Sequence, residues 1–125
     1  SIATPSQRLQ VNGNVLATNV VVPSDARLKE NIVTIERARE LLRTLNGVHY
    51  TWKKDAQAKF GATSGGDVGL LAQDVQKVLP EAVITLPDGT MTVSYDKVVP
   101  LLVEALKARG TWDSAFVAIT LIMAK

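Results

Sequence analysis

The sequence predicts an α+β fold, a small domain of about three helices with short antiparallel strands. Three segments carry apolar residues every three or four positions, as amphipathic helices do, and these are 35–45, 71–79 and 96–109. Three others have the composition and patterning of strands, and these are 48–52, 82–86 and 91–95. A β-rich segment precedes this domain and an apolar, helical tail follows it.

Three parts are expected along the 125 residues. Residues 1–23 are interpreted as the end of a β-structured stalk, 24–109 as a compact domain, and 110–125 as the apolar tail. The leading segment, 1–23, has Arg8 as its only charged residue. Apolar and polar residues alternate on both sides of Asn12-Gly13, which predicts a hairpin. This segment has too few large apolar residues to form a core of its own. We therefore expect it to pair with other copies of itself or with upstream β structure. The alternative is a frayed terminal hairpin.

Composition excludes several classes of function. The formal net charge is +2 and no block of five basic residues occurs, so nucleic-acid binding is not expected. The chain lacks cysteine and has a single histidine, His49, so we expect no disulfide, metal or cofactor. No signal peptide is visible at the start, and the longest apolar run, 115–124, is too short to span a membrane as a helix.

The first predicted helix has Thr34 as its N-cap, and Asn46-Gly47 ends it. In the strand that follows, Tyr50 and Trp52 share the inner face, whereas His49 faces the other way and is interpreted as structural. Residues 53–67 are polar and rich in glycine, which predicts a loop.

The second helix ends at Pro80, because proline cannot continue a helix. Pro87-Asp88-Gly89 has the composition of a turn between two strands. The last helix tolerates Pro100 in its first turn and is expected to close at Gly110. The tail beyond it is apolar at almost every position, so we expect it to be buried against other copies; a disordered end is the alternative.

Ser24 and Lys29 form a candidate catalytic pair. A serine hydroxyl needs a base to become a nucleophile. Lysine can be that base only where burial or a cationic neighbour disfavours its charged form, and Arg27 is a candidate neighbour. The alternative interpretation is an ordinary helix start at Ser24-Asp25 with a solvated lysine.

Four motifs stand in order along the chain. They are Ser24-Asp25-x-Arg27-x-Lys29-x-Asn31-Ile32, Val48-x-Tyr50-x-Trp52, the run from Gly69 to Val75 continuing to Pro80-Glu81, and Val93-x-Tyr95 followed by 101–107. Together they resemble the self-cleaving intramolecular chaperone domain of phage tailspikes and tail fibres, of the endosialidase type. The same domain type occurs in the myelin regulatory factor of animals. The resemblance covers roughly residues 24–108.

The resemblance implies a homotrimer that brings an upstream β-stalk of the same polypeptide into register and lets it fold. It also implies a serine peptidase that acts once, in cis, on the bond between Pro23 and Ser24. Ser24 would be the nucleophile and Lys29 the base, with Asp25, Arg27 and Asn31 in orienting or supporting roles.

The expected location is the precursor of a phage virion tail, assembled in the host cytoplasm, with the released fragment absent from the mature fibre. Two other functions remain open. One is a structural trimerisation cap that never cleaves, and the other is a monomeric module that binds a receptor or a sugar through the 53–67 loop.

Overall fold

The computed structural model describes residues 5–123, with side-chain burial for all of these except 109–118 and 120. Two compact units divide the chain. Unit 1 holds the described residues up to Val33 together with Gly47–Gly69, and unit 2 holds Thr34–Asn46 together with the described residues from Leu70 onward. Helices and two small antiparallel sheets occur together, so the predicted α+β class is confirmed.

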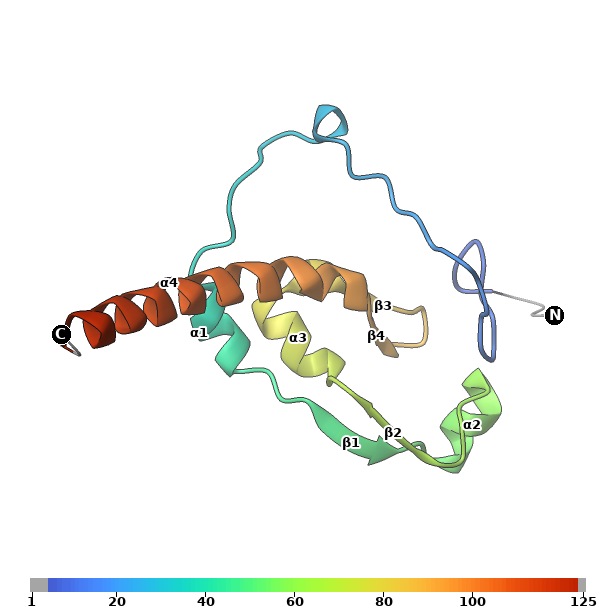
Figure 1. The fold of residues 1–125 in the computed structure, drawn as a ribbon. Helices are drawn as coiled ribbons and strands as arrows, with labels where there is room; N and C mark the ends of the chain where they lie inside the picture. Colours follow the sequence, from blue (N-terminus) through green and yellow to red (C-terminus); the bar gives the residue numbers. More distant parts are fainter. Residues whose placement is uncertain (1–4, 124–125) are drawn as a thin grey trace. The chain divides into compact units, whose positions relative to one another are not determined.

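Unit 2 is built on the long helix α4 (Val99–Met123), drawn in orange and red in Figure 1. Helix α1 (Ala38–Arg43) packs against it, and α3 (Ala72–Val78) belongs to the same unit. Two small groups of buried residues form the core. The first group is Ala38, Leu101 and Ala105, and the second is Val75, Ala82 and Val98. Leu45 and Leu79 pack against both groups, so the core of unit 2 is continuous.

A hairpin of β3 (Val83–Thr85) and β4 (Met91–Val93) completes unit 2, with Val83 opposite Val93. Its turn has Gly89 at φ +89°, a left-handed conformation that glycine adopts without steric cost. The 3₁₀ turns Pro80–Ala82 and Tyr95–Val98 flank the hairpin. The turn predicted at residues 87–89 is therefore confirmed.

The sheet of unit 1 consists of β1 (Val48–Thr51) and β2 (Gly66–Gly69), which run antiparallel. Side chains of β1 alternate between half-buried and exposed, as the sequence predicts, with His49 on the exposed side. Tyr50 and Trp52 share the other face and meet edge to face, with ring centroids 5.2 Å apart.

The loop predicted over residues 53–67 is wrong in part. Helix α2 (Lys54–Phe60) lies inside it, and β2 begins at its end. The apolar pattern does not reveal this helix because it has no apolar stripe, although alanine, lysine and glutamine favour a helix. Gly61, at φ +67°, ends it in the left-handed conformation typical of a helix C-terminus.

Two predicted helix boundaries are also wrong. Helix α1 starts at Ala38, not after Thr34, because Arg37 lies in the left-handed region at φ 55° and interrupts the helical backbone. Helix α4 continues through Gly110 to Met123. Glycine inside a helix costs only about 1 kcal/mol relative to alanine, which is not enough to end a long helix. The tail is helical as expected, whereas the predicted burial of its side chains at 111–118 lies outside what the structure describes.

The predicted hairpin of the leading segment is wrong for the described chain, because residues 5–23 contain no strand. Val20, Val21 and Val22 belong to no helix or strand, and all three are exposed. A two-stranded hairpin is only marginally stable in water unless further strands or an apolar surface pack against it. This explains why the predicted hairpin is not formed in a single chain. Within residues 5–123, no helix is both long enough and apolar enough to cross a membrane.

Leu101 is the largest fully buried side chain among the residues whose burial is described, so the stability of unit 2 should depend on it. We expect Leu101→Ala to lower the free energy of unfolding by roughly 2–5 kcal/mol, because it removes buried methyl groups and leaves a cavity. Urea denaturation followed by circular dichroism measures this loss. The same substitution at Leu9, which is 82% exposed, is the control and should leave the transition of unit 2 unchanged.

Candidate functional site: a serine–lysine pair

A single 3₁₀ turn, Ala26–Leu28, reverses the chain between Ser24 and Lys29. Asp25 caps this turn, since its Oδ1 accepts the backbone N–H of Arg27 at 2.9 Å. The backbone N–H of Leu28 donates to the Asp25 carbonyl at 3.0 Å, and that of Lys29 donates to the Ala26 carbonyl at 3.1 Å. These bonds all lie within six residues, so the turn forms from local interactions.

The turn brings the two candidate residues into contact. Lys29 Nζ donates a hydrogen bond to Ser24 Oγ over 2.7 Å, within the distance that links a nucleophile to its base. Both side chains are exposed, as is every residue from 11 to 34. In this arrangement the lysine acts as donor; proton transfer from the hydroxyl requires a neutral amine in the same place.

Arg27 is bound to Asp25 and not to the lysine. Its Nη2 donates to Asp25 Oδ2 at 2.8 Å, and its Nε lies 3.2 Å from both carboxylate oxygens. The guanidinium, and after it the Arg27 backbone N–H, hold the pKa of Asp25 below its ordinary value. The charge of Arg27 is therefore compensated within the turn, and this geometry favours a supporting role over that of an unpaired cation beside Lys29.

Asn31 and Pro23 flank the turn on its two sides. Asn31 lies in the left-handed region at φ 53°, a conformation that asparagine tolerates better than most residues. Pro23 precedes Ser24 in an exposed segment without regular secondary structure, so the peptide bond that joins them is open to solvent. The residues that the sequence singled out around Ser24 thus lie in or next to one turn.

The turn at Ser24 lies at the start of a region that is similar to a known protein family. Residues 24–84 match the model of a peptidase family described as chaperone of endosialidase, and the match begins at Ser24. This part of the chain belongs to the chaperone-of-endosialidase family. The matched residues contain the whole turn, the sheet of unit 1, helix α1 and helix α3.

Relatives of the chaperone-of-endosialidase domain include tail proteins of phages. The chain is 41% identical over 98 residues to the long tail fiber protein Gp37 of Enterobacteria phage K3 and to that of Enterobacteria phage T2. These matches use 75% of the chain but only 8% and 7% of the two relatives. An uncharacterized membrane protein of Dictyostelium discoideum is 36% identical over 124 residues, which are 84% of the chain and 7% of that protein.

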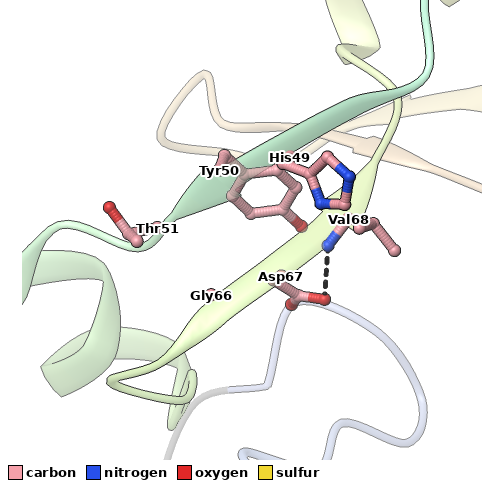
Figure 2. Close-up of a pocket in the computed structure, with 6 residues that line it drawn as sticks. All are labelled: His49, Tyr50, Thr51, Gly66, Asp67 and Val68. Carbon is pink, nitrogen blue, oxygen red and sulfur yellow. Dashed lines mark hydrogen bonds between the residues drawn. The ribbon is translucent and has the colours of Figure 1, made fainter.

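A second candidate site is the groove along β1 and β2, of about 720 Å³. Figure 2 shows the six residues that line it, among them His49, Tyr50 and Asp67. Asp67 Oδ1 accepts the backbone N–H of Val68 at 2.8 Å, and its Oδ2 accepts the indole N–H of Trp52 at 3.0 Å. The bond to Trp52 links β2 to the residue that follows β1, which gives the carboxylate a structural role.

Sequence reasoning did not single out Asp67. The signal that would have found it is the pairing of β1 with β2, which places Asp67 opposite Tyr50 on the face shared with Trp52. Because β2 lies in a stretch with the composition of a loop, the sequence alone does not indicate that pairing. In the chaperone-of-endosialidase domain, Asp67 therefore joins the Tyr50-x-Trp52 motif as part of one structural cluster.

The bonds to Asp67 predict a pH-dependent change at Trp52. The N–H of Val68, and after it the indole of Trp52, favour the ionised carboxylate and lower the pKa of Asp67. Their contribution to hairpin stability is therefore complete above the pKa of the unfolded chain, about 3.9, and is lost as pH falls through the lower folded value. Trp52 fluorescence in a Trp112→Phe background, which removes the second tryptophan of the chain, should change with a midpoint below about 3.9.

Asp67→Asn in the same background is the control and should abolish the change, because its amide does not titrate. A midpoint at or above the ordinary aspartate value would contradict the assignment.

Proposed function

We propose that this domain is the folding helper of a phage tail fibre. Three chains associate through it, which brings an upstream β-structured stalk into register, and the domain then releases itself by cutting between Pro23 and Ser24. The contact of 2.7 Å between Lys29 Nζ and Ser24 Oγ is the observation on which the cleavage rests. The family of residues 24–84 and the tail fibre relatives support the folding role.

The cleavage proceeds through an ester. A neutral Lys29 amine takes the proton of the Ser24 hydroxyl as Oγ attacks the carbonyl carbon of Pro23. The resulting tetrahedral intermediate collapses when the bond from that carbon to the Ser24 nitrogen breaks, and this nitrogen takes up the proton. Pro23 is then joined to Ser24 Oγ as an ester, which water hydrolyses to a Pro23 carboxylate and a free Ser24 hydroxyl.

Covalent connection supplies much of the rate. Ser24 Oγ belongs to the residue that follows the scissile carbonyl, so nucleophile and carbonyl are already joined. Well-oriented intramolecular reactions of this kind gain roughly 7–11 kcal/mol relative to separate reactants. The remaining requirements are a neutral amine and donors for the oxyanion.

Assembly of three chains meets the requirement for a neutral amine. In one chain Ser24 and Lys29 are both exposed to solvent. Chains that pack over the turn exclude water from it and thereby disfavour the charged form. Cleavage accordingly follows assembly in the host cytoplasm, and the released helper is not retained in the mature fibre.

Exposed apolar residues on α4 support association between copies. Val99, Leu102, Val103 and Leu106 recur at intervals of three and four positions, and all of them are exposed. Such a stripe on one helix is typical of a surface that packs against another helix. The valines of the leading segment are exposed as well, and strands from three chains placed side by side would cover them.

A trimerisation cap that does not cleave is the second candidate function. The exposure of both Ser24 and Lys29 favours it, since a lysine serves as a base only where its surroundings disfavour the charged form. Both candidates require association of chains and differ only in whether the bond before Ser24 is cut.

The cleavage is tested on the chain joined to its natural upstream segment. We expect the wild type to yield a fragment whose first residue is Ser24, identified by intact mass and by N-terminal sequencing. Ser24→Ala and Lys29→Ala should each reduce cleavage by at least about a hundredfold, because each removes one partner of the reaction.

Matched controls are available within unit 1. The variants Ser64→Ala and Lys54→Ala each lose a hydroxyl or an amine outside the turn. Both variants should be cleaved before Ser24 at the wild-type rate. Recovery of intact wild-type chain under assembly conditions would exclude the peptidase and leave the cap.

Association is tested by a charge placed on the stripe of α4. Leu106 is 64% exposed, so Leu106→Glu should fold normally but should convert trimers into monomers, because burying an unpaired carboxylate opposes association. Light scattering coupled to size exclusion measures the mass. Val68→Glu, at an exposed position of β2, is the control and should remain trimeric. A wild-type chain that is monomeric at high concentration would exclude both candidate functions.

A further inference from the structure

We propose that Asp25 is a positioning residue for the cleavage, because its side chain closes the turn that holds Lys29 against Ser24. This inference rests on the proposed function. The resemblance implies an orienting or supporting role for Asp25 without saying what the residue does, and the bond to Arg27 N–H gives it a specific task away from the reacting atoms. Asp25 Oδ1 accepts the Arg27 N–H at 2.9 Å and lies between the two partners in sequence. The bond closes the first half of the turn, and the backbone bonds of Leu28 and Lys29 close the second half.

Little else holds this turn in place in a single chain. Residues 24–33 are all exposed, so no apolar core fixes their backbone. The turn has three residues, and such short elements are not stable on their own. A side chain that satisfies a backbone N–H at the start of the turn therefore has a large effect on how often the turn is formed.

The population of the turn sets the rate of cleavage. Lys29 reaches Ser24 over 2.7 Å only while the backbone between them is reversed, since an extended chain would separate residues five positions apart by roughly 17 Å. Chains in other conformations are inactive, so the observed rate scales with the competent fraction. Removal of the Asp25 side chain lowers that fraction without altering either reacting group.

The hydrogen bond, and not the negative charge, is the feature that positions Lys29. Asparagine has a carbonyl oxygen at the place of Asp25 Oδ1 and is an equally good acceptor for a backbone N–H two residues ahead. Arg27 fixes the orientation of the carboxylate through Nε and Nη2, but this ion pair is exposed, and exposed pairs contribute little. Asp25→Asn should therefore retain the turn, whereas Asp25→Ala should lose it.

The chain offers a matched control at Asp88. Asp88 Oδ1 accepts the backbone N–H of Thr90 at 2.9 Å, the same relation between residues two apart, in the turn between β3 and β4. Asp88→Ala therefore removes a bond of the same kind from unit 2. Any effect shared by Asp25→Ala and Asp88→Ala would reflect general loss of structure.

The test measures single-turnover cleavage of the full chain with its upstream segment. We expect Asp25→Ala to slow the first-order rate constant roughly tenfold, the usual effect of losing such a cap. Asp25→Asn should stay within about twofold of wild type, and Asp88→Ala should be unchanged. A wild-type rate for Asp25→Ala overturns the proposal, as does an Asp25→Asn rate as slow as that of Asp25→Ala, or an equal loss in Asp88→Ala.

A second measurement separates this inference from the proposed function. If the wild-type chain is not cleaved, nuclear Overhauser contacts between the ε-methylene of Lys29 and the β-methylene of Ser24 are recorded on the intact protein. The positioning role is supported, even without cleavage, if these contacts are present in the wild type and in Asp25→Asn and are lost in Asp25→Ala. Contacts that persist in Asp25→Ala overturn it.

Discussion

A lysine and a serine five positions apart meet only if the chain between them turns back on itself. Here one 3₁₀ turn does this, and its hydrogen bonds are all made within the segment 24–29. The contact is therefore a local property of the sequence and does not require the rest of the fold. What the turn cannot supply is an environment free of water, because every residue of this segment is exposed in the single chain.

The core of unit 2 is small. Among residues whose burial is described, only six apolar side chains are buried, and three of them are alanine. Many larger apolar side chains are exposed, on α4 and in the leading segment. A small domain with so small a core has limited stability, and association would bury the apolar surface that folding leaves exposed. The composition and the exposed surface together favour a protein that associates.

The sequence predicted those elements of the fold whose residue pattern is local or strongly periodic. The α+β class, the strand at Val48 and the turn at residues 87–89 follow from apolar spacing and from turn residues. Helix α2 could not be found this way, since it has no apolar stripe, and β2 was hidden in a stretch of polar residues and glycine. The start of α1 depends on the left-handed backbone of Arg37, which neither its residue type nor its neighbours indicate.

Part of the candidate site was predictable because it, too, is a local pattern in the sequence. The spacing of Ser24 and Lys29 suggested a pair, and the hydrogen bond between them agrees with this spacing. The role of Arg27 was harder to predict, because its partner depends on side-chain geometry: it pairs with Asp25, so its charge is balanced. The specific contribution of Asp25 emerged only from the backbone bond that it accepts.

The exposure of the pair has a consequence for the order of events under the proposed function. Pairing of strands from three chains is slow, because loop-closure and association entropy oppose it before contacts form. A helper that associates first raises the effective concentration of those strands. If the helper cut itself off before they paired, this advantage would be lost. Under the proposal, the chains that cover the pair also exclude water from it, so the same step that completes assembly activates the base. Once the helper has left, the stalk cannot refold by the same route, and its persistence then depends on its rate of unfolding.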